Sequence, residues 1–469
     1  MFRKLGEIVS HTSAVGSATP DPANKTVCVP TECCIRHPPG CANEGVWGEG
    51  RVVSVLVPTL GSYLLVGVVA AVTTFCLTPL VGMLARRLGW VYLPNVRTVH
   101  DTALPDIGGL AMYVGFVAAF VTAWFMGSLD VLFESNSEPW GVLIAATIIF
   151  VVGLIDDVRD ISAPAKVFGT VLAGVVLVYF GVEMFAFRLP FYEGAIFLDE
   201  SLSPLITVVW LVGMSQAINL VDGLDGLAAG IVGIGAVSFF LYSERLATLE
   251  LLDTANVGPL FAVVAAGICF GFLPHNFNPA RIFMGDGGAL LLGLLMAVST
   301  SVVGGRVEVG QESVGTTYFF LAPLAIPLLI LGVPIFDTLF AIVRRATSGQ
   351  GLASADKGHL HHRLMEMGHG HRRSVVILWT WTALLSAFVL YPTLTDQNPT
   401  YLPFGIAVIG IVLYTVLHPS VRARRRENGT PPDGLDRPDV QQTVEHEQLQ
   451  LDVSGENFRP QLPSGERDH

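Results

Sequence analysis

Acidic and amide side chains recur in three short motifs of this chain, and their types suit a metal ion and phosphate groups. The motifs are GLIDDVRD with Asp156 and Asp157, NLVDGLDGLAAG with Asn219, Asp222 and Asp225, and RIFMGDGGALLLG with Asp286. Adjacent carboxylates repel each other and need a cation or a shared proton. Oxygen ligands suit Mg²⁺ or Mn²⁺, and the nearby glycines let the backbone approach an anion closely. These motifs predict a site for a metal ion and phosphate.

A histidine-rich segment, DKGHLHHRL, could serve the same chemistry. It holds His359, His361, His362 and Arg363, and cationic side chains of these types suit phosphate oxygens. Simpler interpretations stay open: a plain basic surface for this segment, a helix cap for Asp222 and a solvated helix end for Asp156 and Asp157. An N-cap role for Asp286 is compatible with metal binding. We expect His369 and His371 to be solvated.

Composition places these motifs in a membrane protein. The chain has 469 residues, of which 51% are hydrophobic and 14% charged, against roughly 25% charged in soluble domains. The mean hydropathy is +0.57, and the net charge of −12 argues against a nucleic-acid partner. Apolar runs predict an all-α, polytopic fold with about eleven spans. They lie near 53–82, 108–127, 140–155, 165–184, 204–219, 226–242, 257–274, 287–304, 318–342, 375–393 and 401–418.

The distribution of lysine and arginine predicts the orientation of these spans. One set of loops is rich in basic residues, and the alternate set has only Arg188, Arg245 and Arg306. Because basic loops stay in the cytoplasm, we expect the N-terminus outside, the C-terminus inside and every acidic motif at the cytoplasmic face. The basic set comprises Arg86, Arg87, Arg97, Arg159, Lys166, Arg281, Arg344, Arg345, Lys357, Arg363, Arg372, Arg373 and the cluster from Arg422 to Arg426.

The two ends differ from the apolar middle. Residues 1–50 are polar and include four cysteines, Cys28, Cys33, Cys34 and Cys41. We expect a disordered extracytoplasmic leader there, with disulfide formation as the alternative. Residues 51–419 form the expected transmembrane catalytic domain. Residues 420–469, rich in Pro, Gly, Gln and charge, are expected to be a disordered cytoplasmic tail.

From about residue 80 to 418 the chain resembles the polyprenyl-phosphate N-acetylhexosamine-1-phosphate transferases, of glycosyltransferase 4 type. The resemblance rests on PNVRTVHDTALPDIGGLAMYVGF, GLIDDVRD, NLVDGLDGLAAG, NFNPARIFMGDGGALLLG, PIFDTLFAIVRR and HLHHRL, in that order. The branch that uses UDP-N-acetylmuramoyl-pentapeptide usually shows three consecutive histidines followed by Phe-Glu. HLHHRL is instead similar to the branch that uses UDP-N-acetylglucosamine to begin wall or surface polysaccharides.

The resemblance implies a Mg²⁺-dependent reaction between UDP-GlcNAc and an undecaprenyl or decaprenyl phosphate, at the cytoplasmic face of a bacterial plasma membrane. It implies Asn219 and Asp286 as metal ligands. Asp156 and Asp157 would lie beside the acceptor phosphate, and Asp222 and Asp225 on the nucleotide-sugar side. The phosphate-binding residues it implies are Lys166, His359, His361, His362 and Arg363, with Arg281 and Arg97 as weaker candidates.

Two other functions remain as alternatives. The first is the pentapeptide transferase of peptidoglycan synthesis. The second is a cation-coupled transporter, since acids within a membrane also mark transport paths. Transporters, however, place their site near the midplane between repeated halves. This sequence shows no internal repeat. The sequence leaves open whether the protein pairs as a homodimer.

Overall fold

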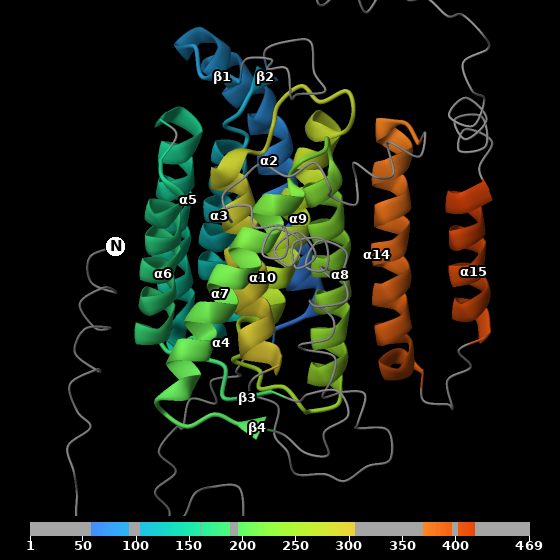
Figure 1. Ribbon diagram of the computed structural model, residues 1–469. Coiled ribbons are helices and arrows are strands. Elements are labelled where there is room, and N and C mark those ends of the chain that lie inside the picture. The colour runs from blue at the N-terminus through green and yellow to red at the C-terminus, as the bar shows by residue number, and fades with distance from the viewer. Residues whose placement is uncertain are drawn as a thin grey trace, which may run out of the picture. The chain divides into compact units, whose positions relative to one another are not determined.

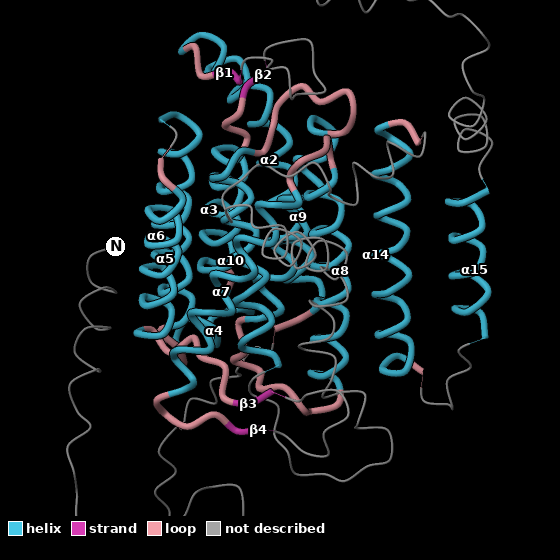
Figure 2. Tube along the Cα trace, in the orientation of Figure 1, coloured by secondary structure: helices cyan, strands magenta, loops and turns pink. Residues whose placement is uncertain are grey.

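The computed structural model describes residues 58–92, 104–159, 161–187, 196–304, 369–395 and 402–417, and these are mainly helical (Figure 1, Figure 2). Two short antiparallel strand pairs connect helices: β1 (Val91–Tyr92) with β2 (Leu104–Pro105), and β3 (Ala186–Phe187) with β4 (Ile196–Phe197). The helices are α2 (Leu60–Leu88), α3 (Gly109–Phe125), the 3-10 turn η1 (Gly127–Leu129), α4 (Asp130–Glu134), α5 (Glu138–Arg159), α6 (Ala163–Tyr179), α7 (Leu202–Val221), α8 (Leu227–Thr248), α9 (Gly258–Asn276), α10 (Gly285–Gly304), α14 (His371–Leu394) and α15 (Leu402–Leu417).

Six of the described helices, α2, α5, α7, α8, α9 and α10, are long and apolar enough to cross a membrane. The α3 helix and the following turn would make a seventh span if the pair, bent by 89°, counts as one. The expectation of a polytopic helical protein is therefore confirmed. Ten of the predicted spans coincide with a described helix. The span predicted at 318–342, the leader and the tail lie outside the described residues, so the count of eleven and the orientation remain predictions.

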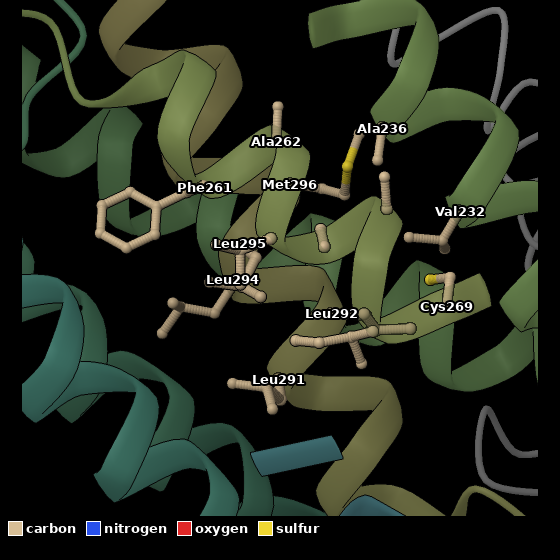
Figure 3. Packing of buried hydrophobic residues seen from close by; sticks show 14 of the residues in the cluster. Val232, Ala236, Phe261, Ala262, Cys269, Leu291, Leu292, Leu294, Leu295 and Met296 are labelled. Carbon is tan, nitrogen blue, oxygen red and sulfur yellow. The ribbon is translucent and has the colours of Figure 1, made fainter. Parts of the chain in front are cut away.

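The α10 helix is the centre of the packing. It contacts α3, α5, α7, α8 and α9, and its apolar side chains from Ala289 to Val303 are buried. Figure 3 shows leucines of α10 and Met296 in one buried cluster with Phe261 and Cys269 of α9 and Val232 of α8. A helix that is apolar on all sides belongs inside a bundle, which explains why the helix that begins with GDGG is enclosed by others.

Glycines bring the neighbours of α10 close to its first turn. A Cβ atom built on Gly153 of α5 would lie 2.5 Å from the Cα of Gly287, and one on Gly109 of α3 would lie 2.3 Å from the backbone nitrogen of Gly288. Small residues at such crossings allow helix backbones to touch within a membrane. The last turn of α5 is thereby held directly against the start of α10.

A proline in α2 is compensated by a side chain of α9. Pro79 lies inside α2 and has no N–H to donate to the carbonyl of Phe75, four residues earlier. The Nε2 atom of His275 lies 3.1 Å from that carbonyl oxygen. Because a carbonyl can only accept, Nε2 must carry the proton. This bond joins α2 to α9 at the point where Pro79 interrupts the backbone hydrogen bonds of α2.

The α14 helix packs on α8, and α15 packs on α14. A Cβ atom on Gly230 of α8 would lie 2.0 Å from the indole ring of Trp379, so the two surfaces are in direct contact. His369, expected to be solvated, is 1% exposed, and its Nε2 lies 2.9 Å from the carbonyl oxygen of Thr415 in α15. That expectation was wrong because an imidazole just before α14 can bind the open carbonyls at the end of α15.

Candidate active site

Three helix ends place two carboxylates around one ammonium group. Asp156 is in the last turn of α5, Lys166 in the first turn of α6, and Asp286 in the first turn of α10. The Nζ atom of Lys166 lies 2.6 Å from Oδ2 of Asp156 and 2.5 Å from Oδ2 of Asp286. The second oxygen of Asp156 accepts the backbone N–H of Ile161 at 2.8 Å. The structure thus brings together three residues that are up to 130 positions apart in the chain.

Asp157 binds the start of α10 directly. Its Oδ1 accepts the backbone N–H of Asp286 at 2.6 Å, and its Oδ2 accepts that of Gly287 at 3.1 Å. The first N–H groups of a helix have no partner within the helix, and an anion there also interacts favourably with the helix dipole. Asp157 therefore caps α10 from a neighbouring helix and fixes the backbone that carries Asp286.

The chain before α3 aligns the residues just before α10. The carbonyl of Pro105 accepts the N–H of Phe283 at 2.9 Å, and the N–H of Gly108 donates to the carbonyl of Phe283 at 3.0 Å. Gly285 follows with φ of +71°, and a Cβ atom there would lie 2.6 Å from an Asp157 carboxylate oxygen and 2.7 Å from the carbonyl of Asp106. The first glycine of GDGG is thus required by both its backbone conformation and its surroundings.

The end of α7 adds an amide and a carboxylate to this group. Asn219 lies in the last turn of α7, a helix that packs along α10. Asp222 follows as the C-cap of α7. Burial, and then the neighbouring charges of Asp106, Asp286 and Asp225, raise the pKa of Asp222 to about 8. The Asp222 carboxylate has no hydrogen-bond donor among the described residues.

Asp106 is a member of this carboxylate group that the sequence motifs did not single out. Its pKa is raised to about 6, first by burial and then by the charges of Asp286 and Asp156. Within the described part of the chain it makes no ion pair or side-chain hydrogen bond. The signal available in LPDIGG was an acid separated by one residue, Ile107, from the Gly-Gly pair that opens a span. We call Asp106, Asp156, Asp157, Asp222 and Asp286, together with Lys166 and Asn219, the acidic cluster.

Asp225 has a different environment from Asp222. It is 3% exposed, and its Oδ2 accepts the side-chain N–H of Asn278 at 2.9 Å and the backbone N–H of Ala280 at 3.0 Å. The backbone N–H of Asp225 donates to Nε2 of His371 at 3.0 Å. His371, expected to be solvated, is thus an acceptor within the fold. These contacts join the turn between α7 and α8 to the loop before α10 and to the start of α14.

Of the remaining predicted residues only Arg281 is described, and it is not part of the cluster. Arg281 lies in the loop before α10 with an exposed side chain, and its carbonyl accepts a hydrogen bond from Arg86 at 3.3 Å. His359, His361, His362 and Arg363 lie outside the described residues, as does Arg97. Their predicted contacts with phosphate therefore remain predictions.

The donor chemistry of the cluster fits a magnesium ion. Among the described residues no three His, Cys, Asp or Glu side chains form a metal cage. Mg²⁺ commonly takes only one or two carboxylates from the protein and completes its shell with water and substrate phosphate. Asp286 supplies a carboxylate at the start of α10, and Asn219 supplies an amide oxygen at the end of the neighbouring α7. Of the described residues, Lys166 is the cation that contacts these carboxylates, so the cluster carries more negative than positive charge.

Comparison with known proteins gives one family. The model of glycosyl transferase family 4 matches residues 139–304, a range that includes Asp156, Lys166, Asn219 and Asp286. A decaprenyl-phosphate N-acetylglucosaminephosphotransferase of Mycobacterium leprae is 39% identical over 78% of this chain and 91% of its own length. A protein of that name from Mycobacterium tuberculosis H37Rv is 40% identical, over 69% and 80% respectively.

A more distant bacterial relative agrees with this result. The probable undecaprenyl-phosphate N-acetylglucosaminyl 1-phosphate transferase of Bacillus subtilis is 36% identical over 66% of this chain and 80% of its own length. The matches cover most of each relative and extend well beyond the range of the family model. The chain belongs to glycosyl transferase family 4, in the branch of the polyprenyl-phosphate N-acetylglucosamine-1-phosphate transferases.

Proposed function

We propose that this protein transfers N-acetylglucosamine 1-phosphate from UDP-GlcNAc to a polyprenyl phosphate and releases UMP. The observation that carries the proposal is the contact of Lys166 with both Asp156 and Asp286 at the meeting point of three helix ends. The named activities of the relatives favour this reaction over the pentapeptide transferase and over transport. The product would be the first lipid-linked intermediate of a wall or surface polysaccharide.

The chemistry is a phosphoryl transfer that needs little acid or base catalysis. An oxygen of the acceptor phosphate attacks the phosphorus that bears the sugar, a new P–O–P bond forms, and the bond to the oxygen of UMP breaks. A phosphate monoester has a second pKa near 6, so the acceptor is already mainly a dianion at neutral pH. The main barrier is the approach of this dianion to a negatively charged pyrophosphate. We favour one direct attack over a covalent aspartyl intermediate.

Asp286 and Asn219 would hold a Mg²⁺ or Mn²⁺ ion. When bound, such an ion neutralises pyrophosphate charge and orients its oxygens. The support for this assignment is that Asn219 ends a helix that packs on α10, and that Asp157 fixes the backbone of Asp286 at the start of α10. Asp222, without a hydrogen-bond donor of its own among the described residues, would offer a further carboxylate, whose charged form a bound cation would favour.

The other residues then take distinct tasks. Lys166 would pair with substrate phosphate when the cation relieves it of one carboxylate, and Asp156 would stay beside the acceptor to position Lys166. Asp157 would act as a positioning residue through α10, a narrower role than that expected from the sequence. Asp225 would act in the same way through the loop before α10.

The donor would be held by residues nearer the nucleotide. Arg281 and the segment from His359 to Arg363 are proposed to bind the pyrophosphate of UDP-GlcNAc. The distribution of lysine and arginine supports a site at the cytoplasmic face of a bacterial plasma membrane.

The decisive experiment is transfer in membranes that contain the protein. Membranes supplied with radiolabelled UDP-GlcNAc, polyprenyl phosphate and Mg²⁺ should yield a lipid-soluble product together with UMP, and EDTA should stop the reaction. Asp286→Asn should abolish transfer because it removes the charged metal ligand. Release of UDP in place of UMP would contradict the proposed reaction. Near-normal turnover of Asp286→Asn would contradict the proposed metal site.

A further inference from the structure

A groove between α14 and α15 has an apolar wall and a cationic end. Its volume is about 350 Å³. The α14 helix lines it with Arg372, Arg373, Val376 and Thr380, and α15 with Gly410 and Tyr414. Both arginines are exposed and lie in the first turn of α14, whereas Thr380 is two turns further along the helix. The groove therefore runs about 10 Å from its charged end along the two helices.

The charged end of the groove lies at the same end of the helices as the acidic cluster. His371, at the start of α14, accepts a hydrogen bond from the turn at Asp225. Arg372 donates from Nε to the carbonyl of Asn278, in the loop before α10, at 2.9 Å. The C-terminal end of α15 is also there, because Thr415 meets His369. The arginines thus lie where these helices end, at the end that the sequence predicts to face the cytoplasm, and Val376 and Thr380 lie further along α14.

The positive charge at this end is not neutralised by the described protein. Arg373 makes no ion pair or hydrogen bond with a described residue, and Arg372 uses only Nε. None of the described residues that line the groove is acidic. Two arginines at the end of an apolar groove, between two helices that the sequence predicts to span a membrane, suit a lipid with an anionic phosphate headgroup.

The groove is separate from the acidic cluster. The cluster is built from α5, α6, α7, α10 and the chain before α3, whereas among the described helices α14 packs on α8 and α15. These arginines are therefore not placed to bind the phosphate of an acceptor that reacts at Lys166. A bilayer phospholipid fits their position instead.

We infer that the groove between α14 and α15 binds one anionic glycerophospholipid, with its phosphate at Arg373 and the free end of Arg372 and an acyl chain along Val376, Thr380 and Gly410. Because Arg372 also holds Asn278, which binds Asp225, the lipid would hold the start of α14 against the loops of the site. This binding does not depend on the proposed transferase activity.

The experiment is a lipid titration of the purified full chain in neutral detergent, read by native mass spectrometry. Phosphatidylglycerol should bind at one molecule per chain and more tightly than phosphatidylcholine with the same acyl chains. Arg373→Gln should weaken phosphatidylglycerol binding about fivefold, the usual effect of one basic residue near an anionic lipid. Arg87→Gln, at the end of α2 and also exposed, is the matched control and should bind as the wild type does.

A second pair of variants tests the apolar part without changing charge. A Cβ atom on Gly410 meets nothing within 4 Å, so Gly410→Leu can fold and fills the groove. Gly405→Leu, equally open but outside the groove, is its control. Gly410→Leu should reduce phosphatidylglycerol binding, and Gly405→Leu should not.

Several results would overturn the inference. They are equal affinity for the two phospholipids, unchanged binding by Arg373→Gln or by Gly410→Leu, and equal losses in the control variants. Competition by inorganic phosphate at similar concentration would show a site for a free anion. Displacement of phosphatidylglycerol by polyprenyl phosphate would show an acceptor site if polyprenyl phosphate no longer competed in Arg373→Gln. Either outcome would refute the phospholipid assignment.

Discussion

Replacement of Asp157 by Asn tests whether this side chain acts through the start of α10. The carboxylate accepts two backbone N–H groups, at 2.6 and 3.1 Å. Asparagine keeps one acceptor oxygen, but its NH₂ group cannot accept the second N–H, and the charge that favours the helix N-terminus is lost. A hydrogen bond to a charged group contributes about 1.5–3 kcal/mol. Since about 1.4 kcal/mol is a factor of ten, loss of the productive arrangement of Asp286 should lower turnover roughly 10- to 150-fold.

The assay separates a positioning role from contact with the acceptor. For Asp157→Asn we expect lower turnover and a higher Mg²⁺ concentration for half-maximal rate, with the KM for polyprenyl phosphate unchanged. The control is Asp199→Asn. Asp199 caps α7 in a similar way, accepting the N–H groups of Ser201 at 3.1 Å and Leu202 at 2.7 Å, but is exposed. Its replacement should leave turnover and metal dependence intact.

Two results would refute the reasoning about Asp157. Turnover of Asp157→Asn within about twofold of the wild type would mean that the cap does not position Asp286. A raised KM for polyprenyl phosphate with unchanged metal dependence would place Asp157 at the acceptor phosphate, as the sequence resemblance implied.

Three further predictions concern the same helix ends. Lys166→Gln should abolish transfer and lower the melting temperature in EDTA, because two facing carboxylates lose their cation. Mg²⁺ should restore much of that stability. An unchanged melting temperature would argue against the ion pairs. Gly153→Ala should cost about 1–3 kcal/mol through overpacking against Gly287 and reduce turnover, whereas Gly213→Ala, whose Cβ meets nothing within 4 Å, should do neither. The Asp106 pKa of about 6 lies above the ordinary value of 3.8 for an aspartate, so the folded state binds more protons than the unfolded state. The free energy of unfolding without metal should therefore fall as pH rises from about 4 to 6. Asp106→Asn should flatten that part of a melting-temperature profile, and an unchanged slope would contradict the clustering of Asp106 with the other acids.

The membrane helices and most of the acidic residues could be predicted because both signals are local. A run of apolar residues long enough to cross a bilayer is visible in any single window of sequence. Acids at the ends of such runs are expensive to place in a membrane, so their presence indicates a functional role. For this reason GLIDDVRD and GDGG were recognisable without the fold, and the structure places their carboxylates within reach of one lysine.

The partners of individual side chains could not be predicted in the same way. The cap of Asp157 on α10 joins residues about 130 positions apart, and it exists because Gly153 lets α5 touch α10. The spacing within NLVDGLDG does not show which of its two acids has hydrogen-bond partners. Asp225 accepts two hydrogen bonds, whereas Asp222 accepts none from the described residues. His371 was misjudged for the same reason, since its partner is the backbone of a distant turn. Asp106 was missed because it belongs to no spaced set of acids.

The arrangement of charge explains why this cluster should hold a cation. Asp156 and Asp157 lie at the end of α5, where the helix dipole disfavours negative charge. Lys166 and the N-terminus of α10 offset part of that cost, since each of these carboxylates has a cation or two N–H groups. Asp106 and Asp222 receive neither from the described residues, and burial together with the neighbouring carboxylates raises the pKa of both. A fold selected for stability alone could place neutral side chains at these two positions. A site for a divalent ion and two phosphorylated substrates has a different requirement. It needs carboxylates whose negative charge no protein cation neutralises, so that the incoming ion can do so.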